Sequence, residues 1–313
     1  MKIFGPVPSR RLGSSLGVNN IPAKNCSYSC TYCQLGPTED PVVERQNFYD
    51  PEDLRKEVVD KVARIEKNND EIDYLSFVPD GEPTLEVKLG EEIDLLASLE
   101  IKIAVISNST LINDKSVRTD LEKADWVSLK VDAAREKTWQ KINRPYESLD
   151  LDKILAGITR FSEEFEGTLT TETMLVEGLN NGKEDLERTA RFIGTVAPDR
   201  AYLSVPTRPP AEDWVKSPNE DSLNRAFQIF DANLENVEYL IGKEGNQFSS
   251  SGDPREDLLS ITSVHPMREE GVKKLLDDSN ENWSLVEELI EQEQLIRVEF
   301  GGDVFYLRKL PNR

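Results

Sequence analysis

From Pro51 onward the chain alternates segments of helical and strand pattern, and this alternation restricts the fold more than any other feature. The expected strands are 16–21, 72–78, 101–107, 126–132, 168–176 and 201–206, and the main helices are 51–66, 87–98, 150–165, 183–195 and 221–233. Elements in this order specify parallel strands joined by right-handed helical crossovers. Six β/α units therefore predict an α/β fold with a partial or full parallel barrel, whose chemistry lies at the carboxyl ends of its strands.

The last part of the chain has a different pattern. Residues 244–256 are polar and rich in Gly and Ser, which is typical of a linker. Three helical patterns follow, near 257–262, 267–277 and 283–293. Gly301-Gly302 then joins two alternating strands into a hairpin. The sequence thus predicts a barrel domain over 1–243 and a small winged-helix-like α+β domain over 257–313.

The charge balance restricts the partners of the chain. It carries 59 acidic and 38 basic residues, a formal net charge of −21, which repels phosphate backbones and anionic lipid surfaces. Residues 252–313 hold 14 acidic and 8 basic residues, so major-groove reading and bulk DNA binding are not expected. No apolar run approaches the roughly 18–20 residues that span a bilayer, and the amino terminus has no signal-peptide stretch. We expect a soluble cytoplasmic protein.

The three cysteines of the chain lie within eight residues, as Cys26, Cys30 and Cys33. An odd number in one short loop is not a disulfide framework. Three thiolates can hold three irons of a [4Fe–4S] cluster and leave the fourth iron open to a ligand. The alternative is a three-thiolate zinc site completed by the single histidine, His265. Because His265 has no nucleophile motif around it, most hydrolase chemistry is disfavoured.

The cysteine spacing, with an aromatic residue before the last Cys, resembles the radical S-adenosylmethionine (SAM) superfamily. The resemblance implies that SAM chelates the open iron and that one electron from the cluster cleaves SAM. The resulting 5′-deoxyadenosyl radical abstracts hydrogen from a substrate. It also implies a one-electron donor such as ferredoxin or flavodoxin. Tyr32 occupies the aromatic position, which implies contact with the adenine of SAM.

A second match follows the expected strand 72–78. Gly81-Glu82-Pro83 resembles the superfamily's "GGE" motif, with Asp80 in place of the first Gly. The resemblance implies that Gly81 and Glu82 hold the amino group of SAM, and a carboxylate suits an ammonium group. The alternative is a plain turn between a strand and a helix.

Polar side chains recur at the expected strand ends and suggest a polar cavity. By the same resemblance, further cofactor-binding candidates are Asn108, Ser128, Lys130, Asp132 and Val176. Candidates for substrate contact are Arg10, Arg11, Glu172 and Arg208, since the planar fork of arginine suits a carboxylate or a phosphate. The alternatives are a satisfied polar lining without contact to SAM, and ordinary surface arginines.

Four segments together resemble one subgroup of the superfamily, the uncharacterised iron–sulfur oxidoreductases loosely related to the wyosine-type tRNA-modifying enzymes. They are GPVPSRRLGSSLGV, the cluster loop ending in CQLG, FVPDGEPTL and the terminal winged-helix-like module. Because the chain has no further cysteines, a second cysteine-ligated cluster is not expected. The leading hypothesis is a radical SAM enzyme acting on a macromolecule, either tRNA or protein. The alternatives are an activase that generates a glycyl radical on a partner protein, and a cluster-based redox sensor.

Overall fold

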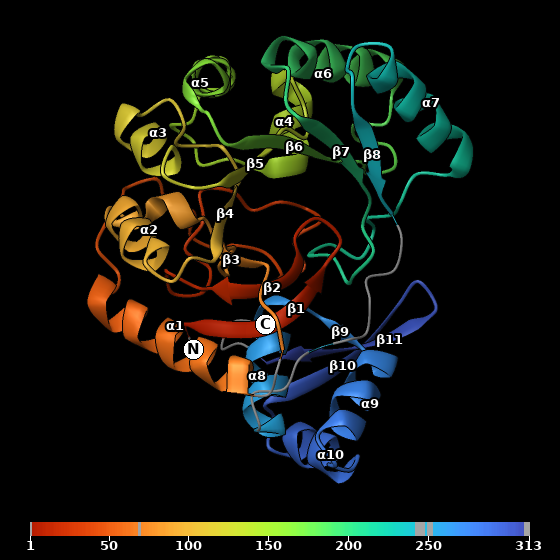
Figure 1. Ribbon diagram of the computed structural model, residues 1–313. Coiled ribbons are helices and arrows are strands. Elements are labelled where there is room, and N and C mark those ends of the chain that lie inside the picture. Colours follow the sequence, from red (N-terminus) through yellow and green to blue (C-terminus); the bar gives the residue numbers. More distant parts are fainter. Residues whose placement is uncertain (1, 68–69, 242–247, 249–252, 310–313) are drawn as a thin grey trace.

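The computed structural model describes residues 2–67, 70–241, 248 and 253–309 (Figure 1). Among them, one sheet has the strand order β1-β2-β3-β4-β5-β6-β7-β8. Its strands are β1 Ile3–Ser9, β2 Gly13–Val18, β3 Tyr74–Phe77, β4 Lys102–Ser107, β5 Trp126–Lys130, β6 Thr168–Met174, β7 Arg200–Ser204 and β8 Val237–Leu240. Every neighbouring pair from β2 to β8 is parallel, whereas β1 is antiparallel to β2. The sheet is a curved, partial parallel barrel.

Helices cover the outer face of this sheet (Figure 1). They are α1 Pro51–Lys67, α2 Leu89–Ala97, α3 Lys115–Leu121, α4 Glu136–Asn143, α5 Leu151–Glu164, α6 Lys183–Val196 and α7 Glu220–Asp231, with the short 3-10 helix η1 Pro83–Leu85. Buried strand residues such as Val105 and Leu203 pack against helix residues such as Val58 and Ile193 in the main core. None of the described helices combines the length and the apolar character needed to cross a membrane.

All six expected strands are present, but the sheet has two edge strands that the sequence pattern did not predict. The edge strand β1 contains Pro6 and Pro8. Proline has no N–H to donate to a neighbouring strand, and an edge strand tolerates this because it has a neighbour on one side only. The other edge strand, β8, has four residues and is only partly buried. The first expected strand, 16–21, lies three residues earlier, as β2. The pattern also missed α4, whose Trp139 and Ile142 are buried.

The carboxyl-terminal part forms a small α+β unit with its own apolar core (Figure 1). Its elements are α8 Pro254–Val264, β9 Met267–Arg268, α9 Glu269–Asp278, α10 Ser284–Glu291, β10 Leu295–Phe300 and β11 Asp303–Arg308. The strands form an antiparallel sheet of order β10-β11-β9, and Gly301 and Gly302 take positive φ angles in the hairpin turn. The three expected helices and the hairpin are therefore present. The predicted α/β fold, with a partial parallel barrel and a small terminal α+β unit, is confirmed.

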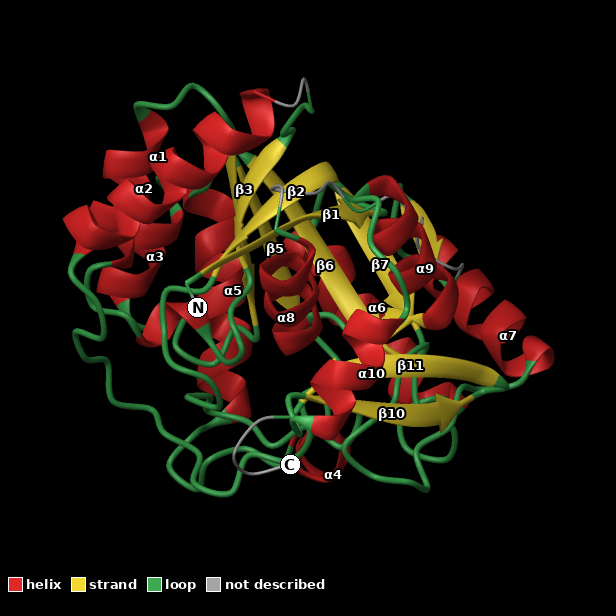
Figure 2. Ribbon diagram, turned by 90° about the horizontal axis from the view of Figure 1, so that it is seen from below, coloured by secondary structure: helices red, strands yellow, loops and turns green. Residues whose placement is uncertain are grey.

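Helix α8 joins this unit to the barrel by packing against β1, and Figure 2 shows α8 from below the barrel. Lys61 of α1 donates to Asp257 of α8 at 3.0 Å, and both side chains are buried. The helix begins at Pro254, capped by Asp253, so it starts three residues before the expected 257. Most of the predicted linker, 244–256, lies outside the described residues.

Candidate active-site cavity and cysteine loop

The three cysteines lie on the long loop between β2 and α1, and neighbouring elements hold this loop in place. The backbone N–H of Thr31 donates to the Ile142 carbonyl at 2.9 Å. Trp139 Nε1 of α4 donates to the Tyr28 hydroxyl at 2.7 Å, and their rings meet edge to face. On the other side, the Glu82 N–H donates to the Asn25 carbonyl at 2.9 Å. The loop is therefore fixed between α4 and the end of β3.

Two of the sulfur atoms lie beside amide donors. Asn108 Nδ2 lies 3.5 Å from Cys26 Sγ, and Asn143 Nδ2 lies 3.5 Å from Cys30 Sγ. Burial raises the pKa of the Cys26 thiol to about 12, and burial followed by the nearby Asp132 raises the pKa of Cys30. Metal binding would release the protons of both thiols.

The donor set fits an iron–sulfur cluster better than a single zinc ion. In a cluster each thiolate binds its own iron, so the three sulfurs need not converge on one atom. Among the described residues, no group of three or more His, Cys, Asp and Glu is arranged to hold a metal ion. His265 Nε2 lies 2.6 Å from the guanidinium of Arg208. Because an arginine only donates, Nε2 accepts there and its lone pair is already engaged, which disfavours the zinc site completed by His265.

Gly81 allows the cysteine loop to approach the end of β3. A Cβ atom at this position would lie 2.0 Å from the Asn25 carbonyl oxygen and 2.9 Å from Ile21 Cδ1. Since backbone cannot give way as a flexible side chain does, only glycine fits. Gly81 also lines the cavity described below.

Glu82 is buried, and neutral donors surround its carboxylate. Oε1 accepts from the N–H of Thr84 at 3.1 Å, from the Thr84 hydroxyl at 2.6 Å and from the Ser107 hydroxyl at 2.8 Å. Oε2 accepts from the N–H of Asn108 at 2.7 Å. Burial raises the pKa of Glu82, and these hydrogen bonds oppose the rise. The carboxylate thus ties the ends of β3 and β4 together directly beside the cysteine loop.

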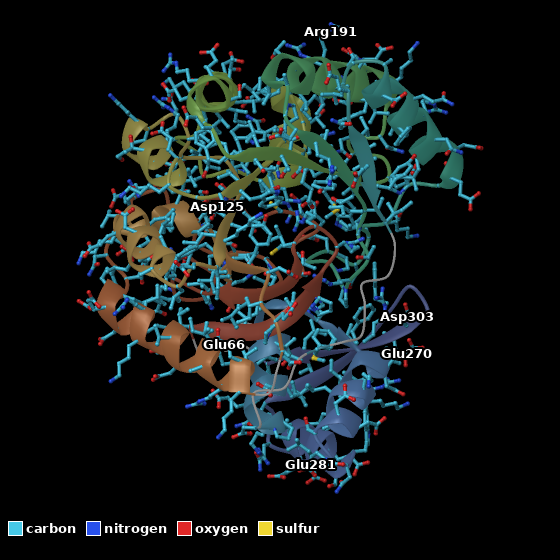
Figure 3. All side chains as sticks on the ribbon, viewed as in Figure 1. Glu66, Asp125, Arg191, Glu270, Glu281 and Asp303 are labelled. Carbon is cyan, nitrogen blue, oxygen red and sulfur yellow. The ribbon has the colours of Figure 1, made fainter. Side chains whose placement is uncertain are left out.

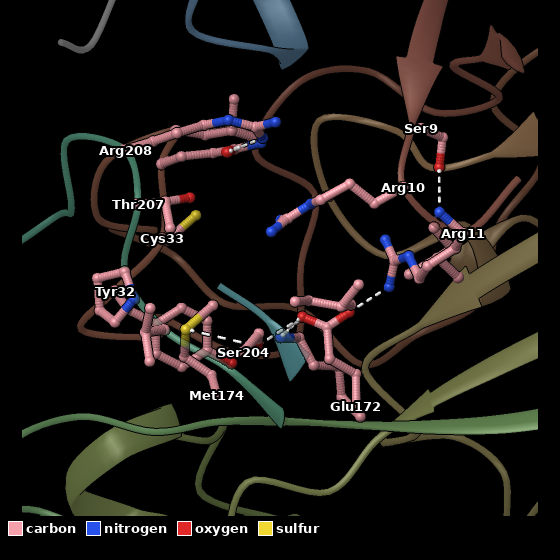
Figure 4. A pocket seen from close by; sticks show the side chains of 18 residues that line it. Ser9, Arg10, Arg11, Tyr32, Cys33, Glu172, Met174, Ser204, Thr207 and Arg208 are labelled. Carbon is pink, nitrogen blue, oxygen red and sulfur yellow. Dashed lines mark hydrogen bonds and ion pairs between the residues drawn. The ribbon is translucent and has the colours of Figure 1, made fainter. Parts of the chain in front are cut away.

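A cavity of about 300 Å³ opens at the carboxyl ends of the strands (Figure 4). Cys33 lines it, so the cysteine loop forms part of its wall. The other lining residues with ionisable side chains are Arg10, Arg11, Tyr32, Lys130, Glu172 and Arg208. The cavity lies where the alternation of strands and helices predicts the chemistry of such a barrel.

Glu172 of β6 is the centre of a charged network in this cavity. It forms an ion pair with Arg11, accepts from Lys130 Nζ at 3.0 Å and accepts from the Ser204 hydroxyl at 3.0 Å (Figure 4). Burial alone would raise the pKa of Glu172, but the charges of Lys130 and Arg11 outweigh it and hold this pKa well below its usual range. Lys130 Nζ also lies 5.0 Å from the centre of the Tyr32 ring. The carboxylate and both cations are therefore charged near neutral pH.

A second network orients Tyr32. Its hydroxyl donates to the buried Asp132, which also accepts from Asn143 Nδ2 at 2.6 Å and from the Met174 N–H at 2.8 Å. Burial, followed by the Asp132 charge, raises the pKa of Tyr32 well above its usual value. Since Asn143 also lies beside Cys30, this network links the aromatic wall of the cavity to the cysteine loop.

The structure brings most of the sequence-predicted residues together. Those that line the cavity are Arg10, Arg11, Tyr32, Cys33, Gly81, Lys130, Glu172 and Arg208. The other predicted residues joined by the hydrogen bonds described above, which do not line the cavity, are Cys26, Cys30, Glu82, Asn108 and Asp132.

Two further predicted residues, Ser128 and Val176, belong to neither of these groups. Ser128 is buried in β5, and its hydroxyl has no hydrogen-bond partner among the described residues. Val176 packs with Ile142, Val215 and Tyr32 in a small apolar cluster. Contact of either residue with SAM stays a prediction.

Residues of the site that the sequence pattern did not indicate include Asn143, Ser204 and Gln34. Asn143 ends α4, an element that the pattern did not predict. Ser204 ends β7, and its position at a strand end was a usable signal. Gln34 directly follows Cys33; its amide donates to the Val264 carbonyl at 2.8 Å and accepts from Arg208 at 2.6 Å. No local pattern connects Gln34 with residues so distant in the sequence.

Comparison with known proteins places this geometry in a wider context. Residues 20–193 match the model of the Radical SAM superfamily. The chain is 45% identical to the UPF0026 protein MJ1312 of Methanocaldococcus jannaschii, over 99% of this chain and 97% of that protein.

Two solved structures share the fold at low sequence identity. A radical SAM methyltransferase from Sphaerobacter thermophilus matches with a TM-score of 0.55 and 16% identity, over 73% of this chain and 67% of its own. Streptococcus suis SuiB bound to S-adenosylmethionine matches with a TM-score of 0.51 and 17% identity, over 70% of this chain and 49% of its own.

Proposed function

The chain belongs to the radical SAM superfamily and to the UPF0026 proteins, and from this premise we propose that it cleaves SAM reductively and abstracts hydrogen from a substrate in the cavity beside Cys33. Cys26, Cys30 and Cys33 would hold one [4Fe–4S] cluster. When bound, the cluster supplies one electron to SAM and so generates a 5′-deoxyadenosyl radical. A one-electron donor such as ferredoxin or flavodoxin would reduce the cluster.

One observation carries the proposal: a loop with three cysteines opens onto a charged cavity at the carboxyl ends of the parallel strands. The side-chain amides of Asn108 and Asn143 lie beside two of the cysteine sulfurs. N–H donors at these positions favour the thiolate form of the ligands and influence the reduction potential of the bound cluster. Tyr32 would offer its ring to the adenine, and its hydroxyl bond to Asp132 fixes the ring's orientation. Gly81 lets the loop pack closely enough for these groups to share one wall.

The cavity favours an enzyme over a redox sensor. A sensor needs the cluster alone, whereas the ion pairs of Glu172 with Arg11 and Lys130 line a space that a substrate can occupy. SuiB, which shares the fold, was solved with SAM bound, and we propose the same cofactor here. The second enzymatic candidate is an activase that abstracts hydrogen from a glycine residue of a partner protein and so generates a glycyl radical there.

The test is SAM cleavage by the full chain, reconstituted anaerobically with iron and sulfide. We expect 5′-deoxyadenosine, detected by mass spectrometry, after addition of SAM and dithionite. Cys30→Ala should abolish cluster assembly and this product. Thr31→Val is the matched control, because Thr31 lies on the same loop and its hydroxyl has no hydrogen-bond partner among the described residues.

Two results would contradict the proposal. Product formation by Cys30→Ala at the wild-type rate would show that the cluster assignment is wrong. A fully loaded wild-type cluster whose electron paramagnetic resonance signal does not respond to SAM, and which gives no 5′-deoxyadenosine, would favour the sensor.

A further inference from the structure

Gln34 joins three parts of the chain that are far apart in the sequence. It directly follows Cys33, and both residues line the cavity. Its Nε2 donates to the Val264 carbonyl at 2.8 Å, and its Oε1 accepts from Arg208 Nη1 at 2.6 Å. Because a carbonyl only accepts and a guanidinium only donates, both bonds can form in only one orientation of the amide. Gln34 therefore connects the cysteine loop to helix α8 and to the loop after β7.

The end of α8 is contacted by both Gln34 and Arg208. Val264 is the last residue of the helix and His265 is its C-cap. Gln34 donates to the carbonyl of Val264, and Arg208 Nη2 lies 2.6 Å from His265 Nε2. The last carbonyls of a helix lack partners within the helix and carry partial negative charge, which N–H donors and a nearby cation stabilise. The two contacts therefore hold the end of α8 beside the cavity lining.

Helix α8 is also held on the barrel at its other end. It packs against β1, and Asp257 in its first turn accepts from Lys61 of α1 at 3.0 Å, with both side chains buried. The backbone hydrogen bonds of a helix make its 11 residues a stiff element. The barrel therefore defines where the end of α8 meets Gln34.

The three cysteines of the loop are held in different ways. The barrel places side-chain amides beside Cys26 and Cys30. The turn at Cys33 is closed by bonds within the loop: the Cys33 N–H donates to the Cys30 carbonyl, and the Gly36 N–H donates to the Cys33 carbonyl, each at 3.1 Å. The side chain of Gln34 joins this turn to elements outside the loop.

We propose that Gln34 is a positioning residue of the radical site, which fixes the Cys33 turn and Arg208 against the end of α8. The inference rests on the proposed function, because it assigns to Gln34 a role toward the cluster that Cys33 would hold. The terminal unit then helps to order the site and is more than a module that presents a substrate. A displacement of about 1 Å can lower a rate by about a hundredfold, so Gln34 acts through the position of its neighbours.

The first experiment is hydrogen exchange on the full chain without the cluster, followed by mass spectrometry. Gln34→Met keeps the length of the side chain and removes both hydrogen bonds. We expect exchange to be faster than in wild type by about fivefold or more, the scale of two lost hydrogen bonds. The faster exchange should appear in the peptides that contain the Cys33 turn and the end of α8.

Gln292→Met is the matched control for this experiment. Gln292 is an exposed glutamine of the terminal unit. Its Nε2 donates to Glu288 Oε1 at 2.8 Å, and its Oε1 accepts from Arg255 Nη1 at 3.3 Å. It therefore makes the same kinds of bond as Gln34 without lining the cavity. Gln292→Met should leave exchange in both peptides unchanged.

The second experiment separates positioning from a purely structural contact, and it uses the reconstituted protein. In Gln34→Met, the change that SAM causes in the electron paramagnetic resonance spectrum of the reduced cluster should differ from that in wild type. Formation of 5′-deoxyadenosine per bound cluster should fall by about tenfold to a hundredfold. Gln34→Glu keeps the acceptor for Arg208 and removes the amide N–H that faces Val264, so its rate should lie between those of wild type and Gln34→Met. Gln292→Met should match wild type in spectrum and rate.

Three results would overturn the inference. The first is equal exchange in Gln34→Met and Gln292→Met. The second is faster exchange in Gln34→Met combined with the wild-type spectrum and rate. The third is the full wild-type rate in Gln34→Glu, which would show that the contact with α8 is not needed.

Failure of the proposed function gives a different result. In that case the reconstituted wild-type protein shows no response of its spectrum to SAM and yields no 5′-deoxyadenosine. Exchange in the protein without the cluster would still distinguish Gln34→Met from Gln292→Met.

Discussion

At the scale of single residues, the buried carboxylates differ because their donors differ. Glu172 faces Arg11 and Lys130, which hold its pKa well below the usual range despite burial. Glu92 of α2 has one amide donor, Asn20 Nδ2 at 3.0 Å, and its Oε1 has no partner among the described residues. Burial raises the pKa of Glu92 to about 8. The first carboxylate is thus charged and the second is protonated at neutral pH.

This difference predicts a pH dependence of stability. The folded pKa of Glu92 is about 8 and its ordinary value is 4.5, so between these values the folded chain keeps a proton that the unfolded chain has released. Stability is therefore lost as pH rises through this window. Between about pH 5 and pH 9, wild type should lose roughly 2–5 kcal/mol of unfolding free energy relative to Glu92→Gln, measured by urea denaturation. Glu91→Gln, at the exposed neighbour of Glu92, is the control and should follow wild type. If the unfolding free energies of wild type and Glu92→Gln changed with pH in parallel, the raised pKa of Glu92 would be contradicted.

The amide beside Cys26 gives a second prediction at this scale. Asn108 Nδ2 lies 3.5 Å from Cys26 Sγ, and an N–H donor stabilises the more negative, reduced form of a cluster. Asn108→Ala should therefore lower the midpoint potential of the reconstituted cluster by roughly 20–60 mV. A redox titration followed by electron paramagnetic resonance measures this. Asn236→Ala, which removes an exposed amide bonded to the Asp199 carbonyl, should leave the potential unchanged; equal potentials in all three proteins would rule out the effect.

At the scale of elements, the site depends on loops held by unrelated neighbours. Trp139 of helix α4 donates a hydrogen bond to Tyr28 of the cysteine loop, and the helix ends at Asn143, whose amide lies beside Cys30. The end of β3 contributes Gly81 on the opposite side. The loop therefore has a defined path because two elements pack on it, and each contact can be tested by itself.

Gly81→Ala tests the contact with β3. The added Cβ would lie 2.0 Å from the Asn25 carbonyl oxygen, so the loop must move. We expect a loss of about 1–3 kcal/mol in unfolding free energy and less iron bound per chain after reconstitution. Gly182→Ala is the control, because Gly182 has an ordinary φ of −71° and its nearest neighbouring atom lies at 3.7 Å. Full cluster loading in Gly81→Ala would show that the close approach is not needed.

At the scale of the whole molecule, α8 joins the terminal unit to the barrel by packing against β1 and through polar contacts. Lys61 and Asp257 form a buried ion pair between α1 and α8, and Gln34 bonds to the end of α8 beside the cavity. Charged side chains such as Arg191 and Glu281 project from the periphery instead (Figure 3). The division into domains over 1–243 and 257–313 is our proposal, and the second unit also supplies His265, which accepts a hydrogen bond from Arg208 of the cavity lining.

The ion pair between α1 and α8 predicts a strong coupling between its partners. Lys61→Met should cost about 3–5 kcal/mol of unfolding free energy, because it leaves a buried carboxylate without this cation. The double variant Lys61→Met/Asp257→Leu should restore most of that loss. Glu57→Gln, which breaks the more exposed pair with Lys2, should cost less than about 1 kcal/mol. Additive losses in the double variant, measured by equilibrium denaturation, would contradict the coupling.

The sequence alone determined the repeating architecture and the cysteine loop. Apolar periodicity is local, so the six expected strands and their helices could be found from neighbouring residues. The spacing of Cys26, Cys30 and Cys33 was likewise visible within one short segment. The edge strands β1 and β8 were not visible, because prolines and partial exposure weaken the strand pattern there.

Only the tertiary structure decided what surrounds the cysteines. Asn143 meets Cys30 because α4 packs on the loop, and Arg208 is oriented by Gln34 and His265, which are far apart in the chain. Glu82 was expected to face the amino group of SAM, and the structure shows it held by four neutral donors. Such contacts join residues from different strands and loops. They depend on how the barrel closes around its interior, which no local pattern in the sequence records.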